Sequence, residues 1–266
     1  MTEPGPGGPV RPLRFGAVGD VHGRFAALAA ELARLRAQAG PLDFLLAVGD
    51  AQANRDEAEA DHIRRPARYR DEVGDFPAVA AGRLDLGAPL YFVGGNHEPW
   101  AALDAHPGGP WSPGVWFLGR AGVRQVHGLR VAYLSGIWSP RVSPAGRPAD
   151  AGPRLRTFYT LEEVEAVARA AGGRPVDVLV THDWPAGIAE PYRGRPVGRP
   201  ELRELAETLR PQLYLCGHLH HRLQARIGPT TVLCLGHIRS GADAVAAVEW
   251  GPDGRLRVLG RGAGAA

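Results

Sequence analysis

The chain has 266 residues, of which 44% are hydrophobic, and this is enough to build the core of one large domain. Its formal net charge is only +3 and all of its basic residues are arginine, which permits an anionic substrate without requiring one. No apolar run approaches the roughly 20 residues of a membrane-spanning helix, and the start of the chain lacks the apolar core of a signal peptide. We therefore predict a cytoplasmic protein with a disordered tail over 1–12, one domain over 13–261 and a flexible tail over 262–266.

The N-terminal part of the chain alternates short apolar runs with an amphipathic segment. Leu13–Val18, Phe44–Val48 and Leu90–Val93 are predicted to be buried strands. Leucines at helical spacing predict a helix over Ala26–Gln38, so that the first two strands form a strand-helix-strand crossover. The charged stretch over 56–75 is expected to form a helix and a loop.

From Gly114 onward, short apolar runs are joined by glycine turns, which predicts that the sheet continues in antiparallel fashion. These runs are Val115–Leu118, Val123–Val126 and Leu129–Leu134. Thr160 and Glu163 have the spacing of a capping box and predict that a helix begins at Leu161 and continues to Ala170.

The last part of the chain contains a second predicted helix, Glu201–Leu209, and several more apolar runs. Strands are expected at Val176–Val180, Leu213–Cys216, Leu223–Ile227, Thr231–Leu235, Ala244–Trp250 and Leu256–Leu259. This order of elements fits an α/β fold in which two mixed β-sheets are stacked and flanked by helices.

Five short polar motifs each follow a predicted strand directly. They are Asp20-Val21-His22-Gly23, Gly49-Asp50, Gly95-Asn96-His97-Glu98, Thr181-His182-Asp183 and Gly217-His218-Leu219-His220. Since the carboxyl ends of parallel strands lie at one edge of a sheet, the motifs can converge on one crevice. A single Asp or His at a strand end is usually a cap or a loop residue, but five motifs in this order indicate a metal centre.

The motifs supply oxygen and nitrogen donors and no thiolate. The donors are Asp20, His22, Asp50, Asn96, His182, His218 and His220. Such a set suits two divalent ions, with Mn, Fe and Zn all acceptable, and Asp50 could bridge them. Two ions about 3.5 to 4 Å apart can hold a phosphoryl oxygen and activate a hydroxide, so we expect phosphoester hydrolysis.

His97 follows the predicted ligand Asn96 without being needed as a ligand itself. As an imidazolium it could protonate the leaving alkoxide or stabilise the transition state, because histidine titrates near neutral pH. Glu98 and Asp183 could each orient a ligand histidine, or could equally be capping or solvated residues.

The two-residue spacing of His218 and His220 predicts that both face the crevice, with Leu219 pointing into the core and His221 pointing to the opposite side of the strand. His237 belongs to no motif, and no functional role is expected for it.

These motifs resemble those of the calcineurin-like metallophosphoesterase superfamily, whose pattern D-x-H, GD, GNH, H and GHxH the chain contains in full. Within that superfamily the chain most resembles the catalytic domain of RNA lariat debranching enzymes, over Leu13 to Arg222. The similarity includes stretches such as Gly94–Glu98 and Gly198-Arg199-Pro200, and Arg55 stands five residues after Asp50, as in debranching enzymes.

The resemblance implies a role for each donor and assigns catalysis to His97. One ion would be bound by Asp20, His22, Asp50 and His220, and the other by Asp50, Asn96, His182 and His218. Arg55, together with Glu98 and Asp183, is a candidate to support the ligands or to contact a substrate phosphate. Debranching enzymes typically have cysteine at the position of Asp20, so their unusual metal occupancy need not apply here.

Two arginine-rich loops, 139–156 and 185–200, are long enough to be either functional or disordered. By the resemblance, Trp138–Phe158 would take the place of the lariat-recognition loop. Residues of the loops and of the charged stretch that could contact nucleic acid are Tyr69, Arg141, Arg147, Arg154, Arg156, Arg193 and Arg195. Equally, the first loop could be a solvated linker whose arginines reflect composition.

The resulting functional prediction is a metal-dependent phosphodiesterase for 2′,5′-linked, branched or otherwise non-standard nucleic acid. Two alternatives stay open: a phosphodiesterase or phosphatase for small nucleotides, and a non-catalytic scaffold of the same fold. Scaffolds tend to lose ligands or the catalytic histidine, whereas this chain keeps all of them. We expect neither a membrane nor a protein partner.

Overall fold

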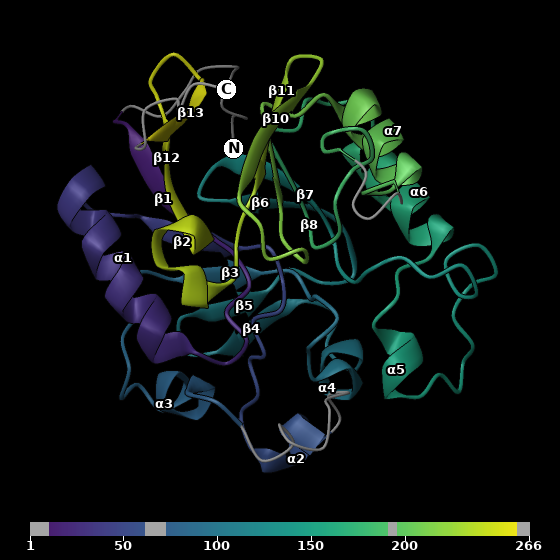
Figure 1. Cartoon of the computed structure of the whole chain (residues 1–266), viewed down its shortest axis with the longest axis horizontal. Helices are drawn as coiled ribbons and strands as arrows, with labels where there is room; N and C mark the ends of the chain where they lie inside the picture. Colours follow the sequence, from purple (N-terminus) through teal and green to yellow (C-terminus); the bar gives the residue numbers. More distant parts are fainter. Residues whose placement is uncertain (1–10, 62–72, 191–195, 260–266) are drawn as a thin grey trace, which may run out of the picture.

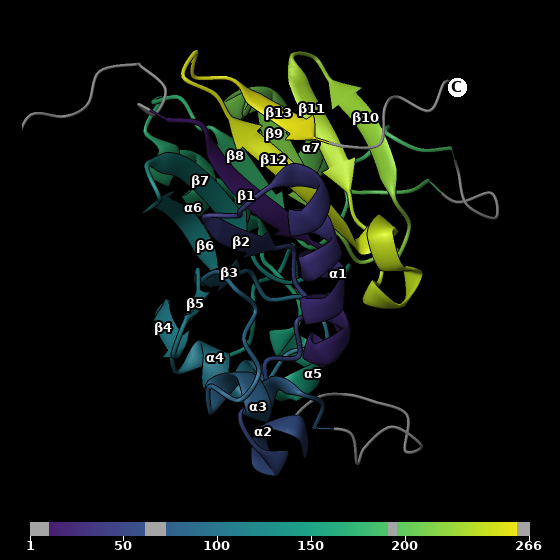
Figure 2. The same ribbon diagram turned by 90° about the vertical axis from the view of Figure 1, so that its left-hand side faces the viewer.

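The computed structural model describes residues 11–61, 73–190 and 196–259, and two stacked β-sheets form its centre (Figure 1 and Figure 2). The larger sheet contains, in spatial order, β13 (Leu256–Leu259), β12 (Val245–Trp250), β1 (Leu13–Val18), β2 (Phe44–Ala47), β3 (Leu90–Phe92), β5 (Val115–Phe117) and β4 (Gly109–Ser112). The smaller contains β10 (Leu223–Ile227), β11 (Thr230–Cys234), β9 (Leu213–Cys216), β8 (Val178–Thr181), β7 (Leu129–Leu134) and β6 (Ala121–Val126). The prediction of two stacked mixed sheets is confirmed.

The strands that precede the polar motifs are parallel neighbours within each sheet. In the larger sheet β1, β2 and β3 run parallel, and in the smaller sheet β8 and β9 do so. The carboxyl ends of these strands therefore carry their motifs to a common edge of each sheet.

The expectation that the sheet continues antiparallel from Gly114 is confirmed only in part. β5 pairs in parallel with β3 and antiparallel with β4, and β6 and β7 form an antiparallel hairpin in the other sheet. The hairpin closes at His127 and Gly128, whose φ values of 49° and 92° belong to a tight turn with both central residues left-handed. The earlier glycine turn, at Gly119, instead joins β5 to a strand of the other sheet.

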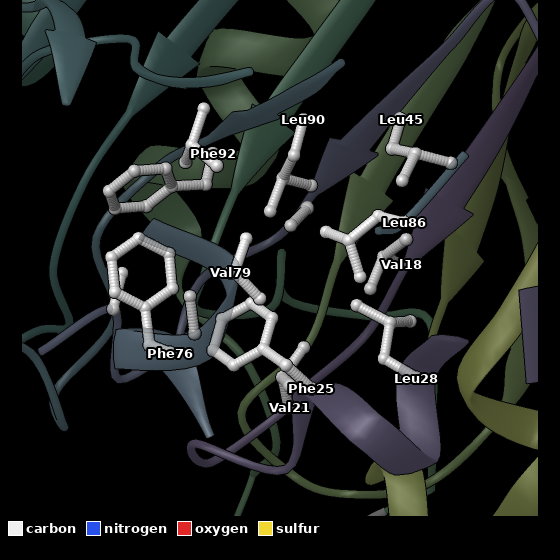
Figure 3. Packing of buried hydrophobic residues seen from close by; sticks show 14 of the residues in the cluster. Val18, Val21, Phe25, Leu28, Leu45, Phe76, Val79, Leu86, Leu90 and Phe92 are labelled. Atoms are coloured by element: carbon white, nitrogen blue, oxygen red, sulfur yellow. The ribbon is translucent and has the colours of Figure 1, made fainter. Parts of the chain in front are cut away.

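The residues between the sheets follow the two-residue period of strands. Phe15 of β1 and Phe44 of β2 are fully buried there, and their rings stack with centroids 4.9 Å apart. The opposite faces of the sheets are covered by helices. Helix α1 (Phe25–Ala39) packs on the larger sheet, and α6 (Leu161–Ala171) and α7 (Pro200–Leu209) pack on the smaller one, on the other side of the molecule (Figure 1). Figure 3 shows Phe25 and Leu28 of α1 in one hydrophobic cluster with Leu45 and Leu90 of the larger sheet.

The capping box predicted at the start of α6 is confirmed. The Thr160 hydroxyl accepts a hydrogen bond from the Glu163 amide at 3.2 Å, and the Glu163 carboxylate accepts one from the Thr160 amide at 2.9 Å. The helix ends at Gly172, which has a φ of 59°. Both ends of α6 are therefore readable from local sequence.

Several short elements were not expected from the sequence. They are α3 (Phe76–Ala80), α4 (Trp100–Asp104), β4, α5 (Pro153–Arg156) and the 3₁₀ helix η2 (Ile238–Ala244). The helix expected in the charged stretch is α2 (Glu57–Asp61), and the remainder of that stretch lies outside the described residues. The predicted tails also lie outside them, apart from residues 11 and 12. In the described ranges, no helix has the length and apolar character needed to cross a membrane.

Candidate metal centre

All five motifs meet at the carboxyl ends of β1, β2, β3, β8 and β9. Asp20, His22, Asp50 and His220 each place one potential ligand atom so that these atoms lie within 4.8 Å of one another. The first three belong to loops of the larger sheet, whereas His220 follows β9 of the smaller sheet. The cluster therefore lies where the ends of the two sheets meet.

The backbone around this cluster is in an unusual conformation. His22, Asp50, His218 and His220 have φ values of 49°, 49°, 69° and 55°. Non-glycine residues seldom occupy this left-handed region, and where they do, a functional constraint is a common reason. The structure thus concentrates backbone strain on residues that the sequence predicts as ligands.

Glycines beside the cluster leave room for its side chains. A Cβ atom at Gly95 would lie 2.2 Å from Oδ1 of Asp50, and one at Gly217 would lie 2.3 Å from Oδ1 of Asp20. Both distances are well below van der Waals contact, so any side chain at either glycine would displace a carboxylate. The glycines of the GNH and GHxH motifs are required by this close approach.

The first group of donors consists of Asp20, His22, Asp50 and His220, whose side chains lie close together. Nε2 of His22 lies 3.1 Å from Nε2 of His220 and 3.4 Å from Oδ2 of Asp50, and Nε2 of His220 lies 3.1 Å from Oδ2 of Asp20. Burial lowers the pKa of His22, although Asp50 and Asp20 oppose this, so its neutral form is favoured. The hydrogen bond to Asp20 raises the pKa of His220. Imidazoles and carboxylates converging in this way fit a divalent cation, which binds imidazole in its neutral form.

The second group of predicted donors consists of Asp50, Asn96, His182 and His218. It contains buried polar atoms that have no hydrogen-bond partner among the described residues. Nδ1 of His182 donates to the Val48 carbonyl at 2.9 Å, and its Nε2 lies 3.4 Å from Oδ2 of Asp50. Burial lowers the pKa of His182, but Asp50 outweighs this and raises that pKa to about 10. Neither Nε2 of His182 nor Oδ1 of Asn96 has a hydrogen-bond partner. Because buried polar groups are normally paired, these atoms fit a second cation, with the ring of His218 5.1 Å from that of His182.

Asp50 is the residue shared by the two groups. Burial raises the pKa of its carboxyl, but the histidines around it, His182 foremost, outweigh this and hold the pKa well below its usual value. The carboxylate is therefore ionised and accepts the backbone hydrogen of His97 at 2.7 Å through Oδ1. The ring of His97 has its centroid 5.0 Å from that of His22, and its Nδ1 is buried without a partner among the described residues.

Glu98 connects the loops that carry Asp50 and Asn96. Its buried carboxylate accepts backbone hydrogens from Ala51 at 2.8 Å, Gln52 at 3.0 Å and Gly95 at 3.4 Å. Burial, reinforced by the charge of Asp50, raises the pKa of Glu98 to about 8. Its hydrogen bonds thus go to the backbone flanking the predicted ligands Asp50 and Asn96.

Asp183 connects its own loop to two neighbouring segments. Oδ2 accepts from the Trp138 amide at 3.2 Å and from Nε of Arg199 at 3.1 Å, while Oδ1 accepts from the Trp184 amide at 2.9 Å. The carboxylate follows the predicted ligand His182 in the chain, so these bonds hold the segment on which that ligand stands.

The arginines predicted to contact substrate fall into two classes. Arg55 pairs with Glu59 and lies over the ring of Trp111, and Arg147 and Arg156 pair with Glu163 and Asp104. In contrast, the side chains of Arg141 and Arg154 are exposed. Tyr69, Arg193 and Arg195 lie outside the described residues.

His237, for which no role was expected, lies against the first group. Its ring stacks on that of His22 at 4.8 Å and 13°, and meets that of His220 edge-on at 4.9 Å. Nδ1 accepts the Arg239 amide at 2.9 Å, and burial, with His22 nearby, lowers the pKa of His237 to about 4, so the ring is neutral with its hydrogen on Nε2. Only its position in the loop after β11 could have indicated this contact.

The expected orientation of the residues around His218 and His220 is wrong. Because both histidines have positive φ, the segment is not an extended strand and side chains do not alternate between faces. Leu219 is 43% exposed instead of buried, and His221 lines the same cavity as the two predicted ligands. This cavity of about 730 Å³ extends from His218 and His220 to Arg199.

Residues 13–222 match the family described as calcineurin-like phosphoesterase. Among its relatives, the lariat debranching enzyme of Schizosaccharomyces pombe is 31% identical over 233 residues, which cover 80% of this chain and 49% of that protein. The lariat debranching enzyme of Arabidopsis thaliana is 32% identical over 206 residues, which cover 70% of this chain and 49% of that protein. The chain thus spans about half the length of these curated relatives.

Solved structures share the fold at low sequence identity. TT1561 of Thermus thermophilus has a TM-score of 0.57 at 16% identity, with 93% of this chain and 98% of that chain covered. GAP50, described as the anchor in the inner membrane complex of Plasmodium, has a TM-score of 0.54 at 12% identity, with 94% and 84% covered. Since the family match spans most of the sequence and includes all five motifs at the converging strand ends, the chain belongs to the calcineurin-like phosphoesterase family.

Proposed function

We propose that this protein is a metal-dependent phosphodiesterase that uses two divalent ions and acts on 2′,5′-linked, branched or otherwise non-standard nucleic acid. The observation that carries the proposal is the meeting of carboxylate and imidazole donors from four loops around Asp50, to which the loop of Asn96 is hydrogen-bonded through the His97 amide. The donors accept Mn, Fe or Zn, and their chemistry does not choose among these metals.

One ion is assigned to Asp20, His22, Asp50 and His220, and the other to Asp50, Asn96, His182 and His218. When bound, the ions supply Lewis-acid stabilisation of phosphoryl oxygens and lower the pKa of water. The protein's part is to hold the donors in place: Val48 orients the ring of His182, and the Glu98 carboxylate connects the loops of Asp50 and Asn96.

His97 is assigned the role of proton donor to the leaving alkoxide. Its backbone is hydrogen-bonded to Asp50, so the residue is fixed beside the ligands, while Nδ1 of its ring makes no hydrogen bond to a described residue. A positioned general acid of this kind contributes about 10²- to 10⁴-fold to the rate.

The nucleic-acid part of the proposal is supported by the debranching enzymes among the relatives and by the exposed Arg141 and Arg154. One observation favours the alternative of a small nucleotide as substrate. The cavity beside the ligands has a volume of about 730 Å³, which is in the range of small-molecule sites.

The test is hydrolysis by metal-reconstituted protein of 2′,5′- and 3′,5′-linked dinucleotides, branched RNA, cyclic nucleotides and nitrophenyl esters. We expect metal-dependent cleavage with preference for the 2′,5′ linkage, and loss of that cleavage in His97→Ala. Preference for cyclic nucleotides or monoesters would favour the small-nucleotide alternative. A protein that binds metal but cleaves none of these substrates would fit the scaffold instead.

A further inference from the structure

The cavity next to the predicted ligands has both charged and apolar lining residues. Arg199 lines it together with the carboxylates Asp183 and Glu190, and Leu219, Val197 and Ala189 provide apolar surface. Trp184 is buried at the cavity and donates from Nε1 to the Gly217 carbonyl, directly before the predicted ligand His218. The wall of the cavity is thus attached to the backbone of the metal centre.

Arg199 is held in place by its backbone and by its side chain. Its amide donates to the Trp184 carbonyl at 2.8 Å, and its carbonyl accepts from the Ala186 amide at 3.0 Å. This bridge requires Gly198, because a Cβ there would lie 2.2 Å from the Pro185 carbonyl oxygen. The Arg199 backbone therefore cannot shift without breaking the bridge.

The guanidinium of Arg199 is oriented but only partly used. Its Nε donates to Asp183 at 3.1 Å, and its central carbon lies 4.8 Å from the centroid of the Trp138 ring. Its two terminal nitrogens make no hydrogen bond to a described residue, and its side chain is 35% exposed to solvent. A fixed, planar pair of N–H donors of this kind matches the oxygens of a phosphate group.

Leu219 is the apolar counterpart. Within the described ranges only two large hydrophobic side chains are exposed, Leu161 at 38% and Leu219 at 43%. Leu161 is the first residue of a surface helix, whereas Leu219 lies between two predicted ligands and lines the cavity. An exposed leucine at this position offers a surface for the flat face of a nucleobase.

We propose that this cavity is a nucleotide-binding subsite, in which Arg199 binds a phosphate next to the scissile one and Leu219 contacts the attached base. The cavity volume of about 730 Å³ is sufficient for one nucleotide. The catalytic consequence of the subsite rests on the proposed phosphodiesterase function, but nucleotide binding by the cavity does not.

Binding to chelator-treated, metal-free protein tests the subsite directly. Adenosine 5′-monophosphate, adenosine and ribose 5-phosphate are titrated in a calorimeter. Arg199→Gln should weaken the binding of adenosine 5′-monophosphate about 10-fold or more and the binding of adenosine much less. Arg199→Lys should have an intermediate effect, because lysine keeps the positive charge but lacks the paired N–H donors of the guanidinium. Leu219→Ala should weaken the binding of adenosine about 5-fold and the binding of ribose 5-phosphate by less.

Two matched controls separate the subsite from general effects. Arg169→Gln removes another exposed arginine with a carboxylate partner, and Leu161→Ala removes the other exposed leucine. Neither should change nucleotide binding. The proposal is overturned if the unsubstituted protein does not bind adenosine 5′-monophosphate, or if the controls weaken it as much as the cavity variants do.

Kinetics separate this proposal from the proposed function. With metal present, Arg199→Gln should lower kcat/KM for a 5′-phosphorylated 2′,5′-dinucleotide about 10 times more than for bis(nitrophenyl) phosphate. Equal losses on both substrates would refute the subsite and leave the phosphodiesterase intact. If no substrate is cleaved, the proposed function fails and the metal-free titration alone decides the subsite.

Discussion

Asp50 is the residue on which both groups of donors depend. One carboxylate oxygen lies 3.4 Å from a ring nitrogen of His22 and 3.4 Å from one of His182. Asparagine keeps the size of this side chain but has no negative charge to share between two cations. We therefore expect Asp50→Asn to lose most bound metal and nearly all activity, measured by metal analysis of the purified variant.

Asp183→Asn is the control for this substitution, since Asp183 hydrogen-bonds the backbone and Arg199. It should retain most of its metal. Two full equivalents of metal in Asp50→Asn would contradict the bridging role.

His97 has a backbone hydrogen bond to Asp50 but a ring that completes neither donor group. His97→Ala should keep its metal and lose about 10²- to 10⁴-fold in rate on a substrate with a poor leaving group. The loss should be smaller for a nitrophenyl ester, whose leaving group needs no proton. Equal losses on both substrates would mean that His97 stabilises charge or geometry and does not act as an acid.

His237 supports the rings of His22 and His220 from outside the predicted ligand set. Removal of such a supporting contact typically weakens metal binding about 10- to 100-fold. His237→Ala should show this loss in a metal titration, whereas His237→Phe should retain most of the affinity because it keeps a ring to stack on His22. If the phenylalanine variant is as weak as the alanine variant, the Arg239 amide contact matters more than stacking.

At the scale of elements, the loop before α6 shows two different uses of arginine. Arg147 hydrogen-bonds both carboxylate oxygens of Glu163 and the Phe158 carbonyl, and Arg156 bonds Asp104 of α4. Arg141 and Arg154 are exposed instead. The loop is thus attached to two helices and leaves two cations for solvent or substrate.

Arg147→Ala should therefore lower the free energy of unfolding by about 1–3 kcal/mol, because it leaves the partly buried Glu163 carboxylate without its charged partner. For a domain of this size the melting temperature falls by about 2–4 °C for each kcal/mol. Thermal unfolding measures the change, and Arg141→Ala should have almost no effect on it. A large drop for Arg141→Ala would show that the exposed arginine supports the loop as well.

The double variant Arg141→Ala/Arg154→Ala addresses nucleic-acid binding separately from stability. If both arginines contact backbone phosphates, the slope of log affinity for branched RNA against log salt should fall by about two units. The affinity loss should be similar for all sequences, since phosphate contacts carry no base information. An unchanged slope would mean that the loop is a solvated linker.

At the scale of the whole molecule, the metal centre is the place where the ends of both sheets meet. Asp20, Asp50 and Asn96 follow strands of the larger sheet, and His182, His218 and His220 follow strands of the smaller one. An ion bound here connects loops that are otherwise separate parts of the chain.

Metal addition should consequently stabilise the native protein over the unfolded chain. At a free ion concentration 100 times the dissociation constant, one site contributes about 2.7 kcal/mol, or a rise of about 5–10 °C in melting temperature. A chelator should reverse the rise in thermal scans, and Asp50→Asn should show little of it. A protein whose melting temperature is independent of metal would not have this centre.

By itself the sequence determined most of the longer elements and predicted a ligand set. β1, β7 and β9 have the predicted bounds, and α6 begins at its predicted capping box, because hydrophobic period and capping are local properties. The polar motifs were recognisable because each directly follows such a strand. Local chemistry and chain order therefore sufficed for the family and for the type of site.

Only the tertiary structure decided how the remaining residues are used. Leu219 is exposed because positive φ values at its neighbours break the alternation of a strand, and β5 pairs in parallel with β3 as well as antiparallel with β4. His237 stacks on His22, and Asp183 holds Arg199 over Trp138. These residues are far apart in the sequence, and the hydrophobic periodicity of helices and strands gives no information on such contacts. These outcomes depend on left-handed backbone conformations and on contacts between remote segments, and a single sequence encodes neither in its local pattern.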